Sequence, residues 1–177
     1  MTNDPMQESV YETERQLWRG LMYRNDFATA DSIAQLIAVV LESESVRTVA
    51  PTGVKRLRPI VNSAFTETHP GIFVSDVMCG DRAFFLQLPH YSATSEFKCT
   101  PNMVGLKFPE HGRNAPIISH ELAHLLRFLE LGLGKYHQES DHGQEFQETY
   151  VATVGVSDAA SSQILSEMFQ NLKMDFQ

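Results

Sequence analysis

The sequence predicts an α+β domain in which N-terminal helices precede a small, mostly antiparallel sheet and two further helices follow it. Two changes in the spacing of apolar residues along the chain support this prediction. Helical spacing of apolar residues extends to about residue 44, short β-branched and aromatic runs fill the middle of the chain, and helical spacing returns from residue 118. The 177 residues are enough for one core, so we expect a disordered tail at 1–8 and a single domain at 9–177.

Two amphipathic helices are expected before the sheet. The first begins near Val10 and ends near 24–26, because apolar residues recur at helical spacing through a charged segment. The second covers about 30–44, with Thr29 or Asp31 as its N-cap. Its apolar residues fall on one face, and they are Ile33, Leu36, Ile37, Val40 and Leu41.

Four segments are expected to be strands, because they are rich in β-branched and aromatic residues and are bounded by turn formers. They are 54–61, 71–78, 83–88 and 103–108. The turn residues at 79–82 predict a hairpin connection, while the order of pairing stays open. The last strand is expected to be a core strand or an edge strand to which an extended peptide could add.

The next helical stretch, 118–129, contains the sequence His120-Glu121-Leu122-Ala123-His124. Positions i and i+4 of a helix lie on one face about one turn apart, so the two imidazoles can hold one metal ion. Glu121 lies about 100° around the helix from His120. This places its carboxylate within reach of a metal-bound water, as a general base requires.

A zinc hydrolase needs a third protein ligand and an open position for water. We favour His142, because Asp141 can cap a following helix, Gly143 allows a close approach to the metal and Phe146 packs that helix down. This helix is expected over about 142–153, before a last one near 160–172. Four other residues are considered as the third ligand. Glu145 and Glu148 are kept in reserve. Glu130 is discounted because the helix continues through it, and His137 is interpreted as a loop residue.

The pattern His120-Glu121-x-x-His124 followed by His142-Gly143-x-x-Phe146 resembles that of SprT-like and related minimal zincin metallopeptidases. The opening Val10-Tyr11-x-x-Glu14, the pair Val46-Arg47, the region 56–59 and the C-terminal helix resemble more closely a group of short metallohydrolases from actinobacteria and their phages. This resemblance covers most of the chain. The resemblance implies a zincin-like fold, with Zn2+ held by His120, His124 and His142 and with Glu121 as the base. The zinc ribbon and basic tail of DNA-associated members have no counterpart here, so a role on DNA-crosslinked proteins is not implied.

The expected function is therefore that of a zinc metallohydrolase, a metallopeptidase with a peptide or protein substrate. Two alternatives stay open: a non-catalytic, zinc-stabilised binding or regulatory protein, and a hydrolase of a non-peptide amide or ester. A second group usually shares the charge of the oxyanion. The residues considered for this role are Tyr136, His137, His111, Arg127 and Tyr150, and the sequence does not rank them.

Composition limits the partners and the location. The net charge of −8 and the pI near 5.3 argue against strong nucleic-acid or anionic-membrane binding, and the basic run 55–58 is interpreted as a solvated strand face. No apolar run approaches a membrane span and the N-terminus is unlike a signal peptide, so a cytoplasmic location is expected. Cys79 and Cys99 form no zinc ribbon, and whether they pair, like the oligomeric state, stays open.

Overall fold

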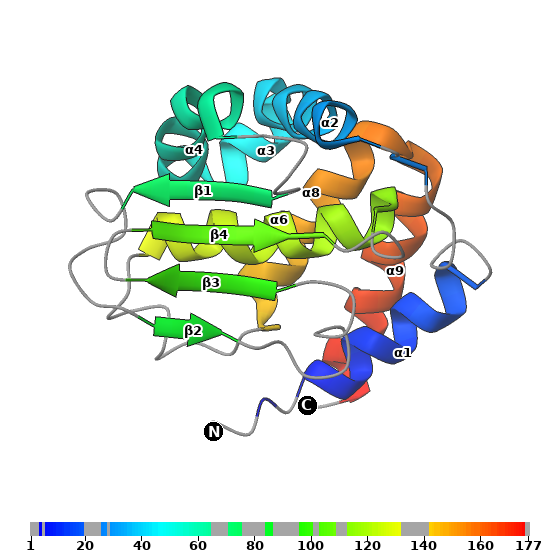
Figure 1. The fold of residues 1–177 in the computed structure, drawn as a ribbon. Coiled ribbons are helices and arrows are strands. Elements are labelled where there is room, and N and C mark those ends of the chain that lie inside the picture. Colours follow the sequence, from blue (N-terminus) through cyan, green and yellow to red (C-terminus); the bar gives the residue numbers. More distant parts are fainter. Residues whose placement is uncertain are drawn as a thin grey trace.

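The computed structural model describes residues 4, 6–19, 26–27, 29–64, 71–75, 84–86, 96–100, 103–108, 113–131 and 142–175. The helices are α1 (Gln7–Leu17), α2 (Ala30–Glu42), α3 (Glu44–Val49), α4 (Pro51–Ala64), α6 (Ala115–Leu131), α8 (Gln144–Ser157) and α9 (Ala159–Asp175), and the strands are β1 (Gly71–Ser75), β2 (Phe84–Leu86), β3 (Glu96–Thr100) and β4 (Met103–Lys107). Figure 1 shows the sheet in front of α6 and α8, with α2, α3 and α4 beyond β1 and with α1 and α9 on the far side of the molecule from the sheet.

The strands pair in the order β1-β4-β3-β2, and every pairing is antiparallel. Gly71 lies opposite Lys107 in the β1–β4 pair, and Glu96 lies opposite the same Lys107 in the β3–β4 pair. The predicted hairpin between the second and third predicted strands is therefore wrong, because β1 and β2 are not neighbours. Of the two alternatives left open for segment 103–108, the structure gives the core strand, because β4 pairs on both sides.

The predicted α+β class is corrected to a predominantly helical fold with a peripheral sheet, within the part of the chain that the structure describes. Segment 54–61, predicted as the first strand, belongs to helix α4. Its buried residues Val54, Leu57 and Val61 follow helical spacing, so burial on one helix face outweighed the strand preference of valine. Strand β3 (Glu96–Thr100) was missed, because the sequence analysis expected no strand between 88 and 103.

Helix α2 confirms its prediction, and its start is set by a capping box. The Thr29 hydroxyl accepts a hydrogen bond from the Ser32 backbone N–H at 3.2 Å, and the Thr29 N–H donates to the Ser32 hydroxyl at 3.3 Å. Thr29, rather than Asp31, is thus the cap. Helix α1 ends at Leu17, earlier than the predicted 24–26, and the Trp18 N–H donates to the Glu14 carbonyl at 2.8 Å.

Helices α4 and α6 approach closely and satisfy each other's ends. The Gly53 N–H, in the first turn of α4, donates to the Glu130 carboxylate at 2.7 Å. In return Arg56 donates to the carbonyl of Leu129, in the last turn of α6, at 2.6 Å. Because end groups of helices lack intrahelical partners, the two contacts fix the axial position of α4 on α6. The basic run 55–58 is thus part of a helix, not a strand face.

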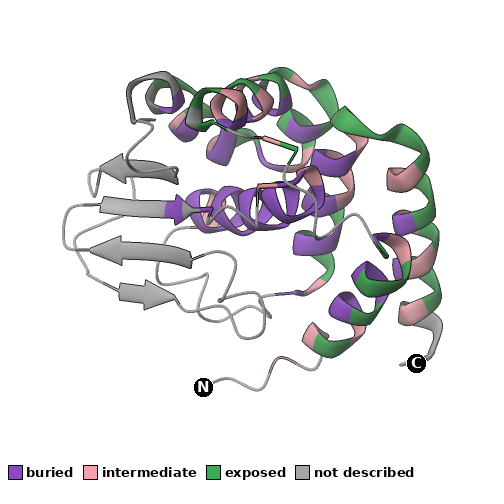
Figure 2. Ribbon diagram, turned by 45° about the vertical axis from the view of Figure 1, so that its right-hand side comes forward, coloured by how far each residue is buried: buried purple, intermediate pink, exposed green. Residues whose placement is uncertain are grey.

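Helix α6 is buried along most of its length, as Figure 2 shows. One side joins the larger apolar cluster, built mainly by α2, α4 and α6. Ala123, on another side, joins a second cluster with residues of α1, α8 and α9, among them Tyr11, Phe146 and Tyr150. The helix with the histidine motif therefore lies between two cores, and both fix its position.

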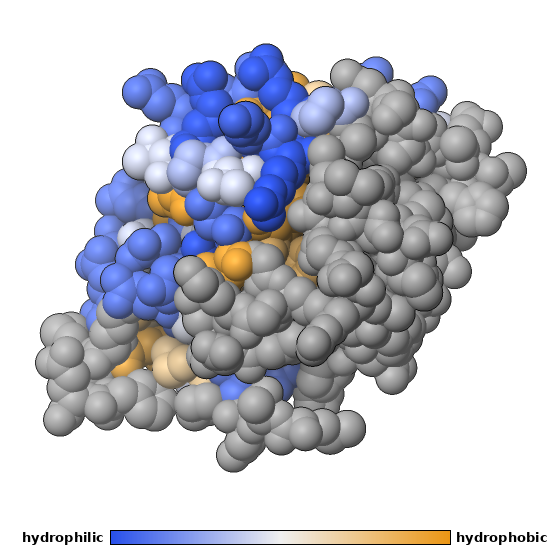
Figure 3. Space-filling view, turned by 90° about the vertical axis from the view of Figure 1, so that its left-hand side faces the viewer, coloured by the Kyte–Doolittle hydropathy of each residue, from blue (hydrophilic) through white to orange (hydrophobic). Residues whose placement is uncertain are grey.

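The described surface is mainly polar. On the face shown in Figure 3, the described residues are mostly hydrophilic, and apolar groups reach the surface only in small areas between them. Among the described residues, Val39 and Ile164 are the exposed large hydrophobic ones, at 58% and 47%. No helix in the described ranges combines the length and the apolar character that crossing a bilayer requires.

We expect Gly53→Ala to destabilise the fold. A Cβ at Gly53 would lie 2.5 Å from the carbonyl oxygen of Leu126, a backbone atom that cannot move without shifting α6. Overpacking of this kind costs about 1–3 kcal/mol, and the gain in helix propensity is about 1 kcal/mol at most. Urea denaturation followed by circular dichroism measures the change.

Gly155→Ala is the matched control, since it also lies in a helix but its Cβ would meet the Ser162 hydroxyl at 3.0 Å. Only this side chain, which donates to the Val151 carbonyl at 2.8 Å, has to shift and no backbone atom does, so the loss of stability should be smaller. Equal stability of the Gly53→Ala variant and the wild type would contradict the close α4–α6 approach.

Candidate metal centre

Helix α6 presents the two histidines of the motif from one face. The Nε2 atoms of His120 and His124 lie 3.1 Å apart. Both side chains are buried, at 3% and 0% exposed, and Glu121 between them is also 0% exposed. The helical spacing that predicted a shared ion is thus realised in the structure.

His142 completes the cluster from the residue before Gly143, the N-cap of α8. Its ring centroid lies 5.4 Å from that of His120 and 4.9 Å from that of His124. One possible ligand atom from each of the three rings lies within 4.8 Å of the other two. The three buried histidines could therefore hold a metal ion. The helix was expected to begin at about residue 142. In the structure His142 instead lies just before α8, outside its first turn.

Two of the three rings are held by buried carboxylates. Glu14 Oε1 lies 2.6 Å from Nδ1 of His120, and Asp4 Oδ2 lies 2.6 Å from Nδ1 of His142. A carboxylate only accepts, so each Nδ1 is the protonated nitrogen of its ring. In the neutral ring the lone pair then belongs to Nε2. The carboxylates therefore set the tautomer that leaves Nε2 available to an ion.

The geometry fits a bound cation. A four-coordinate ion with metal–nitrogen distances of about 2.0–2.1 Å holds two nitrogens about 3.3 Å apart. The 3.1 Å between Nε2 of His120 and Nε2 of His124 is close to this value. His142 Nε2 is buried and has no hydrogen-bond partner, which is costly for a polar atom unless a ligand satisfies it.

The charges around the cluster also suit a cation. Burial lowers the pKa of His120, but the charge and hydrogen bond of Glu14 outweigh it and raise that pKa overall. Burial, with the like charges of His120 and His142, holds the pKa of His124 well below its usual range. Burial also lowers the pKa of His142, despite the Asp4 hydrogen bond. The two rings with lowered pKa favour the neutral form that binds metals.

Aromatic rings enclose the histidines. Phe146 stacks on His124 with centroids 4.3 Å apart, and Tyr11 meets the His142 ring edge-on at 5.2 Å. Tyr150 lies 5.3 Å from His120, and its hydroxyl accepts a hydrogen bond from the Trp18 indole at 3.2 Å. These contacts restrict rotation of the imidazoles and exclude water. The predicted packing role of Phe146 is thus confirmed and extends to the rings themselves.

The other residues considered as ligands or as oxyanion partners have different positions. Glu130 binds the Gly53 N–H, in agreement with its dismissal as a ligand. Glu145 and Glu148 are exposed, and Glu148 pairs with Gln144. Of the residues considered for the oxyanion, Arg127 and Tyr150 are buried. The side chains of His111, Tyr136, His137, Asp141, Cys79 and Cys99 lie outside the described residues.

The sequence analysis did not identify Asp4 or Glu14 as site residues. Asp4 falls in the segment 1–8 that was predicted to be disordered, yet it contacts His142. Glu14 lies on α1 with Val10 and Tyr11, which are both fully buried. A carboxylate three or four residues from two apolar positions lies on the buried face of a helix, and this spacing was the available signal.

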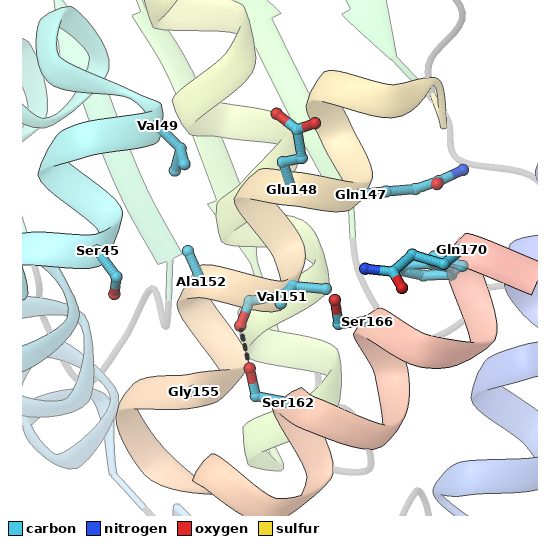
Figure 4. Close-up of a pocket in the computed structure, with 11 residues that line it drawn as sticks. Ser45, Val49, Gln147, Glu148, Val151, Ala152, Gly155, Ser162, Ser166 and Gln170 are labelled. Carbon is cyan, nitrogen blue, oxygen red and sulfur yellow. Dashed lines mark hydrogen bonds between the residues drawn. The ribbon is translucent and has the colours of Figure 1, made fainter. Parts of the chain in front are cut away.

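A cavity of about 480 Å³ lies between α3, α8 and α9 (Figure 4). Gln147 borders it and also donates to the backbone carbonyl of His142 at 3.1 Å. None of the three histidines is among the residues described as lining it. The cavity therefore shares a wall with the cluster without opening onto the ligand rings.

Comparison with protein-family models, with curated proteins and with solved structures finds no match to this chain. The resemblance to SprT-like enzymes therefore rests on the motif residues alone.

We expect His142→Ala to weaken metal binding far more than His137→Ala. Removal of one of three ligands should cost more than the roughly 10–100-fold loss that follows from changing an outer-shell partner. Titration with Zn2+ and Co2+, with a competing chelator, measures both affinities and the expected ratio of one ion per chain. Equal losses in the two variants would contradict the assignment of His142.

Proposed function

We propose that this protein is a zinc-dependent metallohydrolase that cleaves peptide bonds. The observation that carries the proposal is the buried carboxylate of Glu121 next to a cluster of three histidines. Three imidazoles leave one coordination position of a tetrahedral ion open for water, which is the arrangement of catalytic zinc sites. Imidazole ligands suit zinc, as they also suit copper, iron and nickel.

The ion would be held by His120, His124 and His142, each of which offers one ring nitrogen. When bound, zinc supplies a Lewis acid that activates water and polarises a carbonyl group. Glu121 accepts the proton of the attacking water and delivers it to the leaving amine. The charge of Glu121 contributes to the raised pKa of His120, which supports a position close to the cluster.

The surrounding residues assist this chemistry. Glu14 and Asp4 hold protons at the Nδ1 atoms of their histidines, so that the Nε2 atoms stay directed at the ion. Phe146 and Tyr150 exclude water from the ring faces, which strengthens electrostatic interactions inside the site. Peptide bonds are the proposed substrate because the motif resembles that of SprT-like metallopeptidases.

One observation favours a second function, that of a non-catalytic, zinc-stabilised binding or regulatory protein. His120, Glu121, His124 and His142 are all at most 3% exposed. Burial of all four side chains leaves a substrate no direct access in this conformation, and a purely structural metal needs no such access. Glu121 argues for the hydrolase, because a structural site has no need of a carboxylate beside its ligands.

The variant Glu121→Gln separates the two functions. It keeps the shape of the side chain and the three histidines but removes the group that accepts a proton. For a hydrolase, peptide turnover should fall on the order of 10² to 10⁴-fold while zinc content stays at one ion per chain. Zinc content and turnover on a peptide library measure both quantities.

Glu148→Gln is the control, because Glu148 is an exposed carboxylate of α8 that pairs with Gln144. It should leave zinc content and turnover unchanged. Unchanged turnover in Glu121→Gln would end the general-base assignment. Full zinc content in the wild type, with no turnover of peptides, amides or esters, would favour the binding protein.

A further inference from the structure

Both carboxylates at the metal centre come from one N-terminal segment. Asp4 and Glu14 lie 138 and 106 residues before the histidines they contact. They reach two different ligand-bearing elements, since His120 belongs to α6 and His142 precedes α8. The segment 4–17 therefore joins α6 to the start of α8 through the ligand rings themselves.

Several hydrogen bonds fix the Asp4 carboxylate in place against His142. Its Oδ2 accepts from both the ring Nδ1 and the backbone N–H of His142, at 2.6 Å and 3.0 Å. Its Oδ1 accepts from the Met6 N–H at 3.1 Å, next to the start of α1. The side chain of Asp4 is only 7% exposed. One carboxylate thus fixes the orientation of the His142 ring and the position where α1 begins.

The contact of Glu14 leaves a charge that is not fully compensated. Its Oε1 bonds to His120, while its Oε2 is buried without a hydrogen-bond partner. Burial of a carboxylate is costly unless positive charge lies nearby. A cation on Nε2 of His120 supplies that charge through the ring. The same cation strengthens the Nδ1–H···carboxylate bond, as in other carboxylate–histidine–metal arrangements.

We propose that Asp4 and Glu14 are positioning residues of the metal site, and that segment 4–17 is a latch whose docking and metal binding stabilise each other. The inference rests on the metal-binding part of the proposed function and needs no catalysis. Since coupling between two sites is reciprocal, the ion must hold the latch by as much free energy as the latch adds to binding of the ion.

The rest of the latch provides a docking surface and internal controls. Val10 and Tyr11 are fully buried in the cluster that contains Phe146 and Tyr150. On the other face of α1, Glu8 and Glu12 pair with Arg15 in exposed ion pairs, both at 2.8 Å. Of the carboxylates on α1, Glu14 therefore contacts a ligand ring, whereas Glu8 and Glu12 are exposed and pair with Arg15.

The test compares the isosteric variants Asp4→Asn and Glu14→Gln with the matched controls Glu8→Gln and Glu12→Gln, all in the full chain. Zinc affinity is measured by competition with a chromophoric chelator. Asp4→Asn and Glu14→Gln should each lose about 10–100-fold in affinity, the usual effect of removing an outer-shell partner. The controls should match the wild type.

A second readout distinguishes positioning from simple stabilisation. The free energy of unfolding is measured in EDTA and in excess zinc for each variant. A merely structural role lowers both values equally, whereas a positioning role reduces the increment that zinc adds, since that increment depends on the dissociation constant. Hydrogen exchange of 4–17 should slow when zinc binds to the wild type, and less so in the two variants.

Unchanged zinc affinity in both Asp4→Asn and Glu14→Gln would overturn the proposal, as would exchange in 4–17 that does not respond to zinc. Failure of the wild type to bind zinc would overturn both this inference and the proposed function. This test does not depend on turnover. If the protein binds zinc and the latch responds, but no substrate is hydrolysed, the latch is supported and only the proposed enzymatic activity is rejected.

Discussion

Burial of α6 over residues 116–129, nearly its whole length, is the constraint on which the rest of the structure depends. An apolar face of the helix packs against α2 and α4, while the face with His120 and His124 points into a second cluster with α1 and α8. A helix buried on all sides cannot leave polar side chains without partners at low cost. Other elements therefore supply partners to this face, and they contribute Glu14 from α1, Phe146 from α8 and His142 from the residues before α8.

Local periodicity predicted the parts of the structure that local geometry decides. Helix α6, the shared face of His120 and His124, and the capped start of α2 follow from 3.6 residues per turn and from capping chemistry. Helix α4 shows the limit, because Val54, Leu57 and Val61 satisfy a helical pattern that their strand preference concealed. The order β1-β4-β3-β2 depends on long-range pairing, which no spacing in the sequence encodes.

The same limit applies to charged residues, since residue type alone does not decide their role. Glu130 was considered as a metal ligand, and Arg56 belongs to a basic run. In the structure Glu130 accepts from the N-terminal end of α4, and Arg56 donates to the C-terminal end of α6. Asp4 and Glu14 are ordinary acidic residues in sequence, and both reach imidazoles more than a hundred positions away. A polar side chain takes the unsatisfied partner that packing brings to it, and packing is a property of the whole fold.

The burial of the centre connects the proposed chemistry to the proposed latch. A substrate carbonyl must come within contact distance of Glu121, which is fully buried in this conformation, so hydrolysis requires an element to move. Helix α1 lies at the periphery in Figure 1 and packs on α9, and its tie to the ligands consists of two carboxylates and a few apolar side chains. Displacing it would expose the rings of His120 and His142 but remove the partners of their Nδ1 atoms. The contacts of Asp4 and Glu14 would then help to retain the ion but hinder access of a substrate. A tightly docked latch therefore favours a structural metal, and a loosely docked latch favours an enzyme.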